Sequence, residues 1–235
     1  MRILITGANR GLGYEFVKQY LDRGDEVIAA ARVLQNVEAL QTLQKTYSNL
    51  LALYELDVTV SKSIKAICES IKSRFESLDL LINNAAIISG GSKRTYPLGE
   101  LHSENIAEVF NVNAIAPLMM AEQFVEILSH RERAKIVNIT SKMGSISSRT
   151  GASNYSYCAS KAALNMFSKL LSLDLKNKGI IVLALHPGHV KTDMGGSAAP
   201  LAPEESIGGM IAVIDSITEE DSGKFLDWEG QEIPW

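Results

Sequence analysis

Short apolar runs alternate with helical segments along the whole 235-residue chain, and this alternation sharply limits the folds open to it. Strands separated by helices at this spacing form right-handed βαβ units, in which neighbouring strands run parallel. We therefore predict an α/β fold, a doubly wound parallel sheet of the Rossmann type, with about seven strands in a single domain over residues 1–235. The predicted strands are 2–6, 26–31, 50–56, 78–82, 135–140, 179–185 and 223–227.

Helices are expected between these strands, and one of them contains a proline. Ser61 is the expected N-cap of its helix. In the helical segment 103–128, Pro117 has no N–H, so the carbonyl of Asn113 loses its usual donor. We predict that this carbonyl holds an ordered water near Lys161; a kink that only fits the helix around the core is the alternative. Two helices are expected to begin near Arg10 and at about residue 157, and four others to cover 35–47, 61–75, 103–128 and 204–217.

Ligands of parallel sheets bind beyond the carboxyl ends of the strands, and several polar or small residues fall there. They are Gly7, Arg32, Asp57, Asn84 and Ser141. Because these ends meet along one edge of the sheet, the sequence predicts a single ligand site at that edge.

A glycine-rich turn follows the first predicted strand. Gly7, Gly11 and Gly13 have the spacing Gly-x-x-x-Gly-x-Gly, which differs from the common Gly-x-Gly-x-x-Gly. Glycines let a backbone approach a phosphate, and the helix that follows supplies N–H donors. A plain strand-to-helix connection is the alternative, but the position between strand and helix favours a dinucleotide site.

The second strand ends at a cation. A free ribose 2′-hydroxyl calls for an acidic residue there, whereas a 2′-phosphate calls for a cation. Arg32 stands at this end, and Asp25 and Glu26 lie at the opposite one. Together with Arg10, Arg32 predicts an anion pocket that favours NADP(H) over NAD(H). Two solvated arginines are the alternative.

Tyr157 and Lys161 are four residues apart in a helical sequence, so both side chains lie on one face. A neighbouring positive charge favours phenolate, and we expect Lys161 to bring the pKa of Tyr157 closer to neutral. A tuned phenol can protonate a developing alkoxide. Ser141 lacks a nucleophile elbow, so its hydroxyl is expected to hydrogen-bond a substrate oxygen.

Composition excludes several other functions. The net charge of −4 gives no reason to expect nucleic acid. Cys68 and Cys158 make no disulfide framework, and four scattered histidines make no metal cluster, so no metal is expected. With no signal peptide and no spanning apolar run, we expect a soluble, cytoplasmic protein without a membrane partner.

Three segments are expected to wall the substrate cleft: 87–97, 142–154 and 190–203. The last is rich in Gly, Ala and Pro, which is typical of a lid but also of a passive surface connection. The helical segments 110–125 and 164–175 are apolar nearly all round, which predicts burial on every side. One face can meet the sheet and the other a second subunit, so a homo-oligomer, dimer or tetramer, is expected.

Taken together, these motifs resemble the short-chain dehydrogenase/reductase family over essentially the whole chain. The residues that carry the resemblance are Thr6 to Gly13, Asn83 to Ala86, Asn113, Ser141, Tyr157, Lys161, Pro187 and Gly188. Arg10 with Arg32 resembles the NADP-preferring members. The turn Asn9 to Gly13 and the ending 223–235 are similar to sniffer-type carbonyl reductases and bacterial C-factor proteins.

This resemblance implies NADPH-dependent reduction of an aldehyde or ketone, or a signalling protein with incidental turnover. It implies that Tyr157 is the general acid/base, that Lys161 binds the nicotinamide ribose, that Ser141 steadies the carbonyl oxygen and that Asn113 holds a relay water. The cofactor residues it implies are Gly7, Asn9, Arg10, Gly11, Leu12, Gly13, Arg32, Asp57, Val58, Asn84, Ala85, Ala86, Tyr157, Lys161, Pro187, Gly188, Val190 and Thr192. Ala86 departs from the family's usual glycine, and the connection from Ser141 to Tyr157 is a few residues longer than usual.

Overall fold

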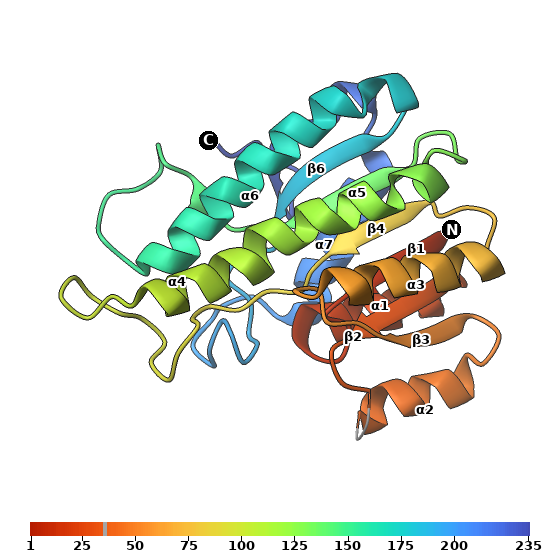
Figure 1. Cartoon of the computed structure of the whole chain (residues 1–235), viewed down its shortest axis with the longest axis horizontal. Coiled ribbons are helices and arrows are strands. Elements are labelled where there is room, and N and C mark those ends of the chain that lie inside the picture. Colours follow the sequence, from red (N-terminus) through yellow and green to blue (C-terminus); the bar gives the residue numbers. More distant parts are fainter. Residues whose placement is uncertain (35–36) are drawn as a thin grey trace.

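A seven-stranded sheet forms the centre of the molecule in a computed structural model that describes residues 1–34 and 37–235. Its order is β3-β2-β1-β4-β5-β6-β7, and every neighbouring pair is parallel, which confirms the predicted doubly wound sheet. Figure 1 shows helices on both of its faces. The strands are β1 (Arg2–Thr6), β2 (Glu26–Ala31), β3 (Leu51–Glu55), β4 (Leu80–Asn83), β5 (Lys135–Ile139), β6 (Ile181–His186) and β7 (Phe225–Asp227).

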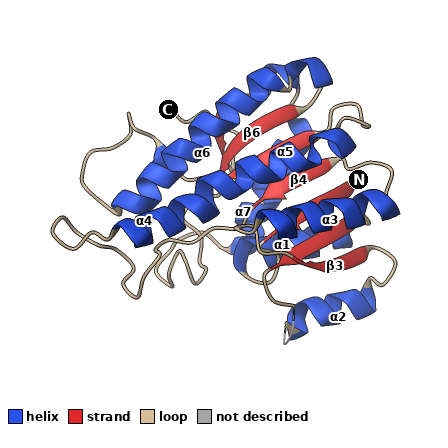
Figure 2. Cartoon of the chain, in the orientation of Figure 1, coloured by secondary structure: helices blue, strands red, loops and turns tan. Residues whose placement is uncertain are grey.

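The helices divide into two layers because each strand is buried on both faces. Ile3 and Ile5 of β1 pack with residues from α1, α2 and α7, whereas Leu4 packs on the other face with residues from α3 and α5. Figure 2 shows these layers around the sheet. The helices are α1 (Gly11–Asp22), α2 (Glu38–Thr46), α3 (Ser61–Arg74), α4 (Ser103–Phe110), α5 (Ala116–Leu128), α6 (Tyr155–Asp174) and α7 (Pro203–Ser216), with 3-10 turns η2 (Lys142–Gly144), η3 (Lys176–Lys178) and η4 (Glu219–Asp221).

Element boundaries differ from the predicted ones mostly by one to three residues, which is common at frayed ends. The predicted cap at Ser61 is wrong: Ser61 is the first helical residue, and Val60 precedes it without a side-chain cap. The helix begins one residue earlier than predicted, because Val60 rather than Ser61 takes the extended conformation of the N-cap. The expected start of α2 at Gln35 lies outside the described residues.

A π-helical turn, η1 (Asn111–Ile115), joins α4 to α5 just before Pro117. The missing N–H of Pro117 removes the ordinary i→i−4 bond to Asn113, and a widened turn is the usual response to such a loss. The predicted disturbance of this helix is therefore confirmed. It places Asn113, which is fully buried, against the neighbouring elements rather than in solvent.

Within one chain, α6 is only partly buried, and the predicted burial of its other face by a second subunit stays a prediction. Leu164 of α6 is buried, but Met166, Leu170 and Leu173 are 58%, 49% and 61% exposed. These three follow i, i+4, i+7 spacing, so they share the face of α6 that points away from the sheet.

Among the described residues, no helix combines the length and the apolar character needed to cross a membrane.

Candidate active site

A cavity of about 510 Å³ lies at the carboxyl edge of the sheet, where β1, β2 and β4 end. This volume is within the range of small-molecule and cofactor sites, roughly 300–1,000 Å³. It is lined by Gly7, Asn9, Arg10, Gly11, Leu12, Arg32, Val33, Leu56, Asp57, Val58, Thr59, Asn84, Ala85, Ala86, Ile87, Val112, Ile139, Thr140, Tyr157, Lys161, Pro187, Thr192, Asp193 and Met194. The glycine turn and the Tyr157–Lys161 pair thus share one site.

The glycine turn leaves no space for a side chain at Gly7 and Gly13. A Cβ on Gly7 would lie 2.9 Å from the Ala85 Cα, and one on Gly13 would lie 2.2 Å from the Gly7 carbonyl oxygen. Helix α1 begins immediately after this turn, and its N-cap, Arg10, makes no side-chain cap. The N–H groups of the first turn therefore remain free for an anion at the cavity, which fits a dinucleotide diphosphate.

Asn84 fastens the end of β4 to this turn. Its Nδ2 donates to the carbonyls of Thr6, at 2.9 Å, and Gly7, at 3.2 Å. The Thr6 hydroxyl in turn accepts from the backbone N–H groups of Asn84 and Ala85. Asn83 lies beside β5, on the opposite side of β4 from β1, and its Nδ2 donates to the Oδ1 of Asn138 at 2.8 Å. The two asparagines therefore tie three strand ends together, and hold the floor of the cavity in place.

Two arginines and two carboxylates surround the end of β2. Arg10 and Arg32 both line the cavity, and Arg10 forms an ion pair of 3.3 Å with Asp193. Both partners are largely exposed, so the pair is weak and leaves the guanidinium available. Hydrogen bonding from the Thr59 hydroxyl holds the pKa of Asp57 below its ordinary value, and the positive charge of Arg32 acts in the same direction.

Tyr157 and Lys161 lie one turn apart on α6, and both are buried. The Lys161 Nζ is 5.8 Å from the centre of the Tyr157 ring and donates to the Ile139 carbonyl at 2.8 Å. The ammonium is therefore held by the end of β5, beside the phenol ring. The Ser141 hydroxyl, in the loop that follows β5, lowers the pKa of the phenol.

The expected downward shift in the pKa of Tyr157 is wrong for this site. Burial raises the pKa of the phenol to about 12, and the Ser141 hydroxyl opposes that rise only in part. Complete burial lowers the pKa of Lys161 to about 7, so its charge is partly lost near neutral pH. The phenol consequently stays protonated through neutral pH, which is the form that donates a proton.

The Asn113 side chain has a role that sequence reasoning missed. Its Oδ1 accepts from the Ile87 N–H at 2.9 Å, and its Nδ2 donates to the Ile87 carbonyl at 2.8 Å and to the Ser160 hydroxyl at 3.1 Å. The side chain therefore clamps the segment after β4, leaving only the backbone carbonyl for the predicted water. No spacing in the sequence indicates a pairing between residues 26 positions apart.

Several predicted residues lie beside the cavity rather than on its wall. They are Gly13, Asn113, Ser141, Gly188 and Val190, none of which is among the lining residues. Gly13 shapes the turn, and Val190 pairs with Leu201 at the base of the 190–203 segment. Thr192, Asp193 and Met194 of that segment line the cavity, so it forms a wall of the site rather than a passive connection.

Comparison with known proteins agrees with this geometry. The short chain dehydrogenase family profile matches residues 1–201, and the chain therefore belongs to the short-chain dehydrogenase family. It is similar to the NADPH-bound carbonyl reductase from chicken fatty liver, with a TM-score of 0.91 and 37% identity over 100% of this chain and 98% of that one. It is also similar to the carbonyl reductase Sniffer of D. melanogaster, with a TM-score of 0.93 and 32% identity over 100% and 99%.

The similarity extends to the C-signal protein of Myxococcus xanthus, which is 39% identical over 158 residues. The match covers 67% of this chain and 93% of C-signal. The resemblance inferred from the motifs, to the family and to its sniffer and C-factor members, is thus confirmed. The chain is a short-chain dehydrogenase/reductase, an oxidoreductase.

Proposed function

We propose that the protein is an NADPH-dependent reductase of a small aldehyde or ketone, acting in reverse as an alcohol dehydrogenase. The observation that carries the proposal is the single cavity that joins the glycine turn, Arg10 and Arg32 to Tyr157 and Lys161. The NADPH-bound carbonyl reductase from chicken fatty liver, to which the chain is similar over 98% of that protein's length, supports the same choice of cofactor.

Some residues of the cavity bind the cofactor in this proposal, and others transfer the proton. The free N–H groups of α1 would hold the diphosphate, the two arginines would hold the 2′-phosphate, and Asp57 and Val58 would flank the adenine. When bound, the reduced nicotinamide supplies the hydride that the reaction requires. Tyr157, protonated at neutral pH, donates its proton to the substrate oxygen, and Ser141 orients that oxygen.

Lys161 and Asn113 complete the proton path in this proposal. Lys161 is held beside the phenol by the Ile139 carbonyl. With the cofactor bound, its ammonium would hold the nicotinamide ribose. With a pKa of about 7, it can both accept and release a proton near neutral pH. The backbone carbonyl of Asn113, which lacks its usual donor because of Pro117, holds the water that links Lys161 to solvent.

Replacement of Tyr157 by Phe tests the mechanism. Tyr157→Phe removes one hydroxyl and keeps the ring, so we expect turnover to fall by about a thousandfold or more, as for loss of a positioned general acid. NADPH affinity, measured by fluorescence titration, should stay within about twofold of wild type. Comparable turnover in this variant would remove Tyr157 from the mechanism.

The similarity to C-signal supports a second candidate, a dinucleotide-binding signalling or interaction protein in which turnover is incidental. A spectrophotometric screen of NADPH oxidation against aldehydes, ketones and quinones separates the two. Turnover of any of these favours the reductase. Tight NADPH binding without turnover across a broad panel favours the signalling protein.

We also propose that the exposed face of α6 pairs with a second copy of the chain. Met166, Leu170 and Leu173 present an apolar surface that a partner would bury. Leu170→Glu introduces a charge at its centre and should shift the protein from a dimer or tetramer towards the monomer in analytical ultracentrifugation. A single wild-type monomer at micromolar concentration would contradict the proposal.

A further inference from the structure

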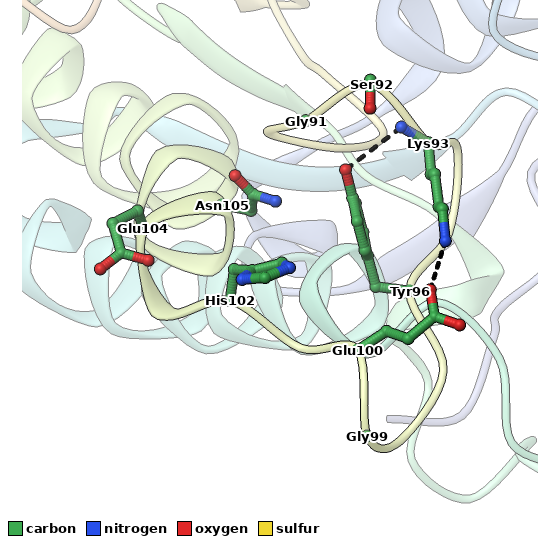
Figure 3. A pocket seen from close by; sticks show the side chains of 9 residues that line it. All are labelled: Gly91, Ser92, Lys93, Tyr96, Gly99, Glu100, His102, Glu104 and Asn105. Atoms are coloured by element: carbon green, nitrogen blue, oxygen red, sulfur yellow. Dashed lines mark hydrogen bonds and ion pairs between the residues drawn. The ribbon is translucent and has the colours of Figure 1, made fainter.

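The segment 88–102, here called the wall loop, is folded on itself but weakly attached to the rest of the molecule. Figure 3 shows its inner side: the Tyr96 hydroxyl accepts from the Lys93 N–H, and the Lys93 ammonium pairs with Glu100. The Tyr96 ring meets the His102 ring edge-on, with centres 5.8 Å apart. These local contacts surround an open hollow of about 660 Å³. Most side chains from 91 to 100 are exposed, so burial does little to hold the loop.

The wall loop lies beside the catalytic cavity because a few side chains fasten it there. Immediately before it, Ile87 lines the cavity and is clamped by Asn113. On its far side, the Arg94 guanidinium donates to the carbonyl of Met194, which also lines the cavity. The loop thus runs from Ile87, on the cavity wall, and is joined to the 190–203 segment at a second lining residue, Met194.

One buried carboxamide joins this loop to the catalytic helix. Asn154 is 4% exposed and is the N-cap of α6, with its Oδ1 accepting from the Tyr157 N–H at 3.1 Å. The Nδ2 of the same group donates to the Ile88 carbonyl at 2.8 Å and the Arg94 carbonyl at 3.0 Å. Both hydrogens of the amide are therefore used to hold the wall loop.

The Oδ1 also accepts from the Ser156 hydroxyl at 3.0 Å. A buried asparagine with all its hydrogen-bonding capacity used on two separate segments fixes their relative position. A serine, threonine or aspartate would serve equally well as an N-cap, but none of these has an amide to donate to the loop. The hydrogen bonds to the wall loop, rather than the capping of α6, therefore explain why residue 154 is an asparagine.

We propose that Asn154 is a positioning residue that places the substrate wall relative to the Tyr157 phenol. It acts through the wall loop on one side and through the first turn of α6 on the other. The inference rests on the proposed reductase function for its kinetic consequence. The tether itself is independent of that function.

Two variants separate the tether from the cap. Asn154→Ser keeps an oxygen acceptor for the Tyr157 N–H and loses the two amide N–H donors to the loop, whereas Asn154→Ala loses both the acceptor and the donors. Asn154→Asp keeps the cap and a similar shape, but it turns an oxygen towards the two loop carbonyls. It replaces Asn154→Ser in the experiment if the serine variant folds poorly. Ser156→Ala, which removes only a bond to the same Oδ1, is the matched control.

Limited trypsin digestion measures the tether without any substrate, because Lys93 and Arg94 are trypsin sites in the loop. For Asn154→Ser we expect cleavage there to accelerate at least about fivefold relative to cleavage at Arg131 and Arg133, which lie in a distant exposed loop. Ser156→Ala should cleave like wild type. Unchanged cleavage of the wall loop in both Asn154→Ser and Asn154→Asp would overturn the tether.

Kinetics with NADPH and benzaldehyde as the probe carbonyl measure the consequence. In Asn154→Ser we expect KM for benzaldehyde to rise about tenfold with kcat within about twofold, and in Asn154→Ala we expect kcat to fall as well. NADPH affinity should not change in either. A fall in kcat with unchanged KM in Asn154→Ser would overturn the positioning role. A wild-type protein without carbonyl turnover would overturn the proposed function alone, since the trypsin rates still decide the tether.

Discussion

The two ends of the cavity are built in different ways. The cofactor end consists of a glycine turn between β1 and α1, with neighbouring strand ends fastened by Asn84 and Thr6. The wall loop is mostly exposed and depends on two hydrogen bonds from Asn154 and one to Met194, residues 60 to 100 positions away. The cofactor end is defined by the space that the backbone leaves, whereas the wall loop is held by a few hydrogen-bond donors. Changes of volume should therefore damage the first, and changes of hydrogen-bonding capacity the second.

Gly13→Ala should produce the largest effect at the cofactor end. The added Cβ would lie 2.2 Å from the Gly7 carbonyl oxygen, so the turn must open. We expect NADPH affinity in fluorescence titration to fall about a hundredfold or more, equivalent to about 3 kcal/mol. Trypsin cleavage at Lys93 and Arg94 should stay at the wild-type rate.

The matched control is Gly208→Ala on α7, where the nearest atom to an added Cβ, the Gln19 Oε1, is 3.7 Å away. It should bind NADPH normally. If Gly13→Ala also binds NADPH as tightly as wild type, then the space left by the glycine turn does not define the cofactor end.

Arg32→Glu should change the choice of cofactor without affecting the substrate wall. It replaces a cation at the end of β2 by a carboxylate, which repels a 2′-phosphate and accepts from a 2′-hydroxyl. We expect the preference for NADPH over NADH in kcat/KM to fall about tenfold or more, with the KM for the carbonyl within about twofold. Lys45→Glu, the same charge change at the end of α2, is the control. An unchanged preference would show that Arg32 does not contact the cofactor.

Lys161 lies where the two ends meet, and its burial predicts a smaller, pH-dependent effect on stability. Its pKa is lowered to about 7, so between pH 7 and its unfolded value the unfolded chain binds more protons. Stability therefore rises with pH in that window, and the cost of burying the charge is fully present below pH 7. We expect the Tm to rise by on the order of 5 °C from pH 7 to 9, relative to the rise in Lys161→Met. Parallel Tm curves for the two proteins would show that the ammonium is not held at a depressed pKa.

The sequence accounts for the cofactor end far better than for the substrate wall. Strand ends that carry Gly7, Arg32, Asp57 and Asn84 must meet along one edge once the sheet is parallel, and the structure brings all four to one cavity. The disturbed helix at Asn113 was also predictable, because Pro117 lacks an N–H wherever it stands. Such features follow from local chemistry and from a topology that the strand and helix pattern already implies.

Other features of the site could not be obtained in this way. The clamp of Ile87 by Asn113 and the bonds of Asn154 to the wall loop join residues far apart in sequence, and no periodicity encodes which polar side chain finds which carbonyl. The pKa of Tyr157 was predicted in the wrong direction because burial cannot be read from the spacing of Tyr157 and Lys161.

By itself the sequence determined the layered fold, the carboxyl edge as the place of the cavity and the position of Tyr157 and Lys161 on one face of a helix, because these depend on spacing of one turn or one strand. Only the tertiary structure decided how deeply Tyr157 and Lys161 are buried, where the wall loop lies and that Asn154 holds it. The physical reason is that desolvation and long-range hydrogen bonds depend on what the folded chain packs around each group.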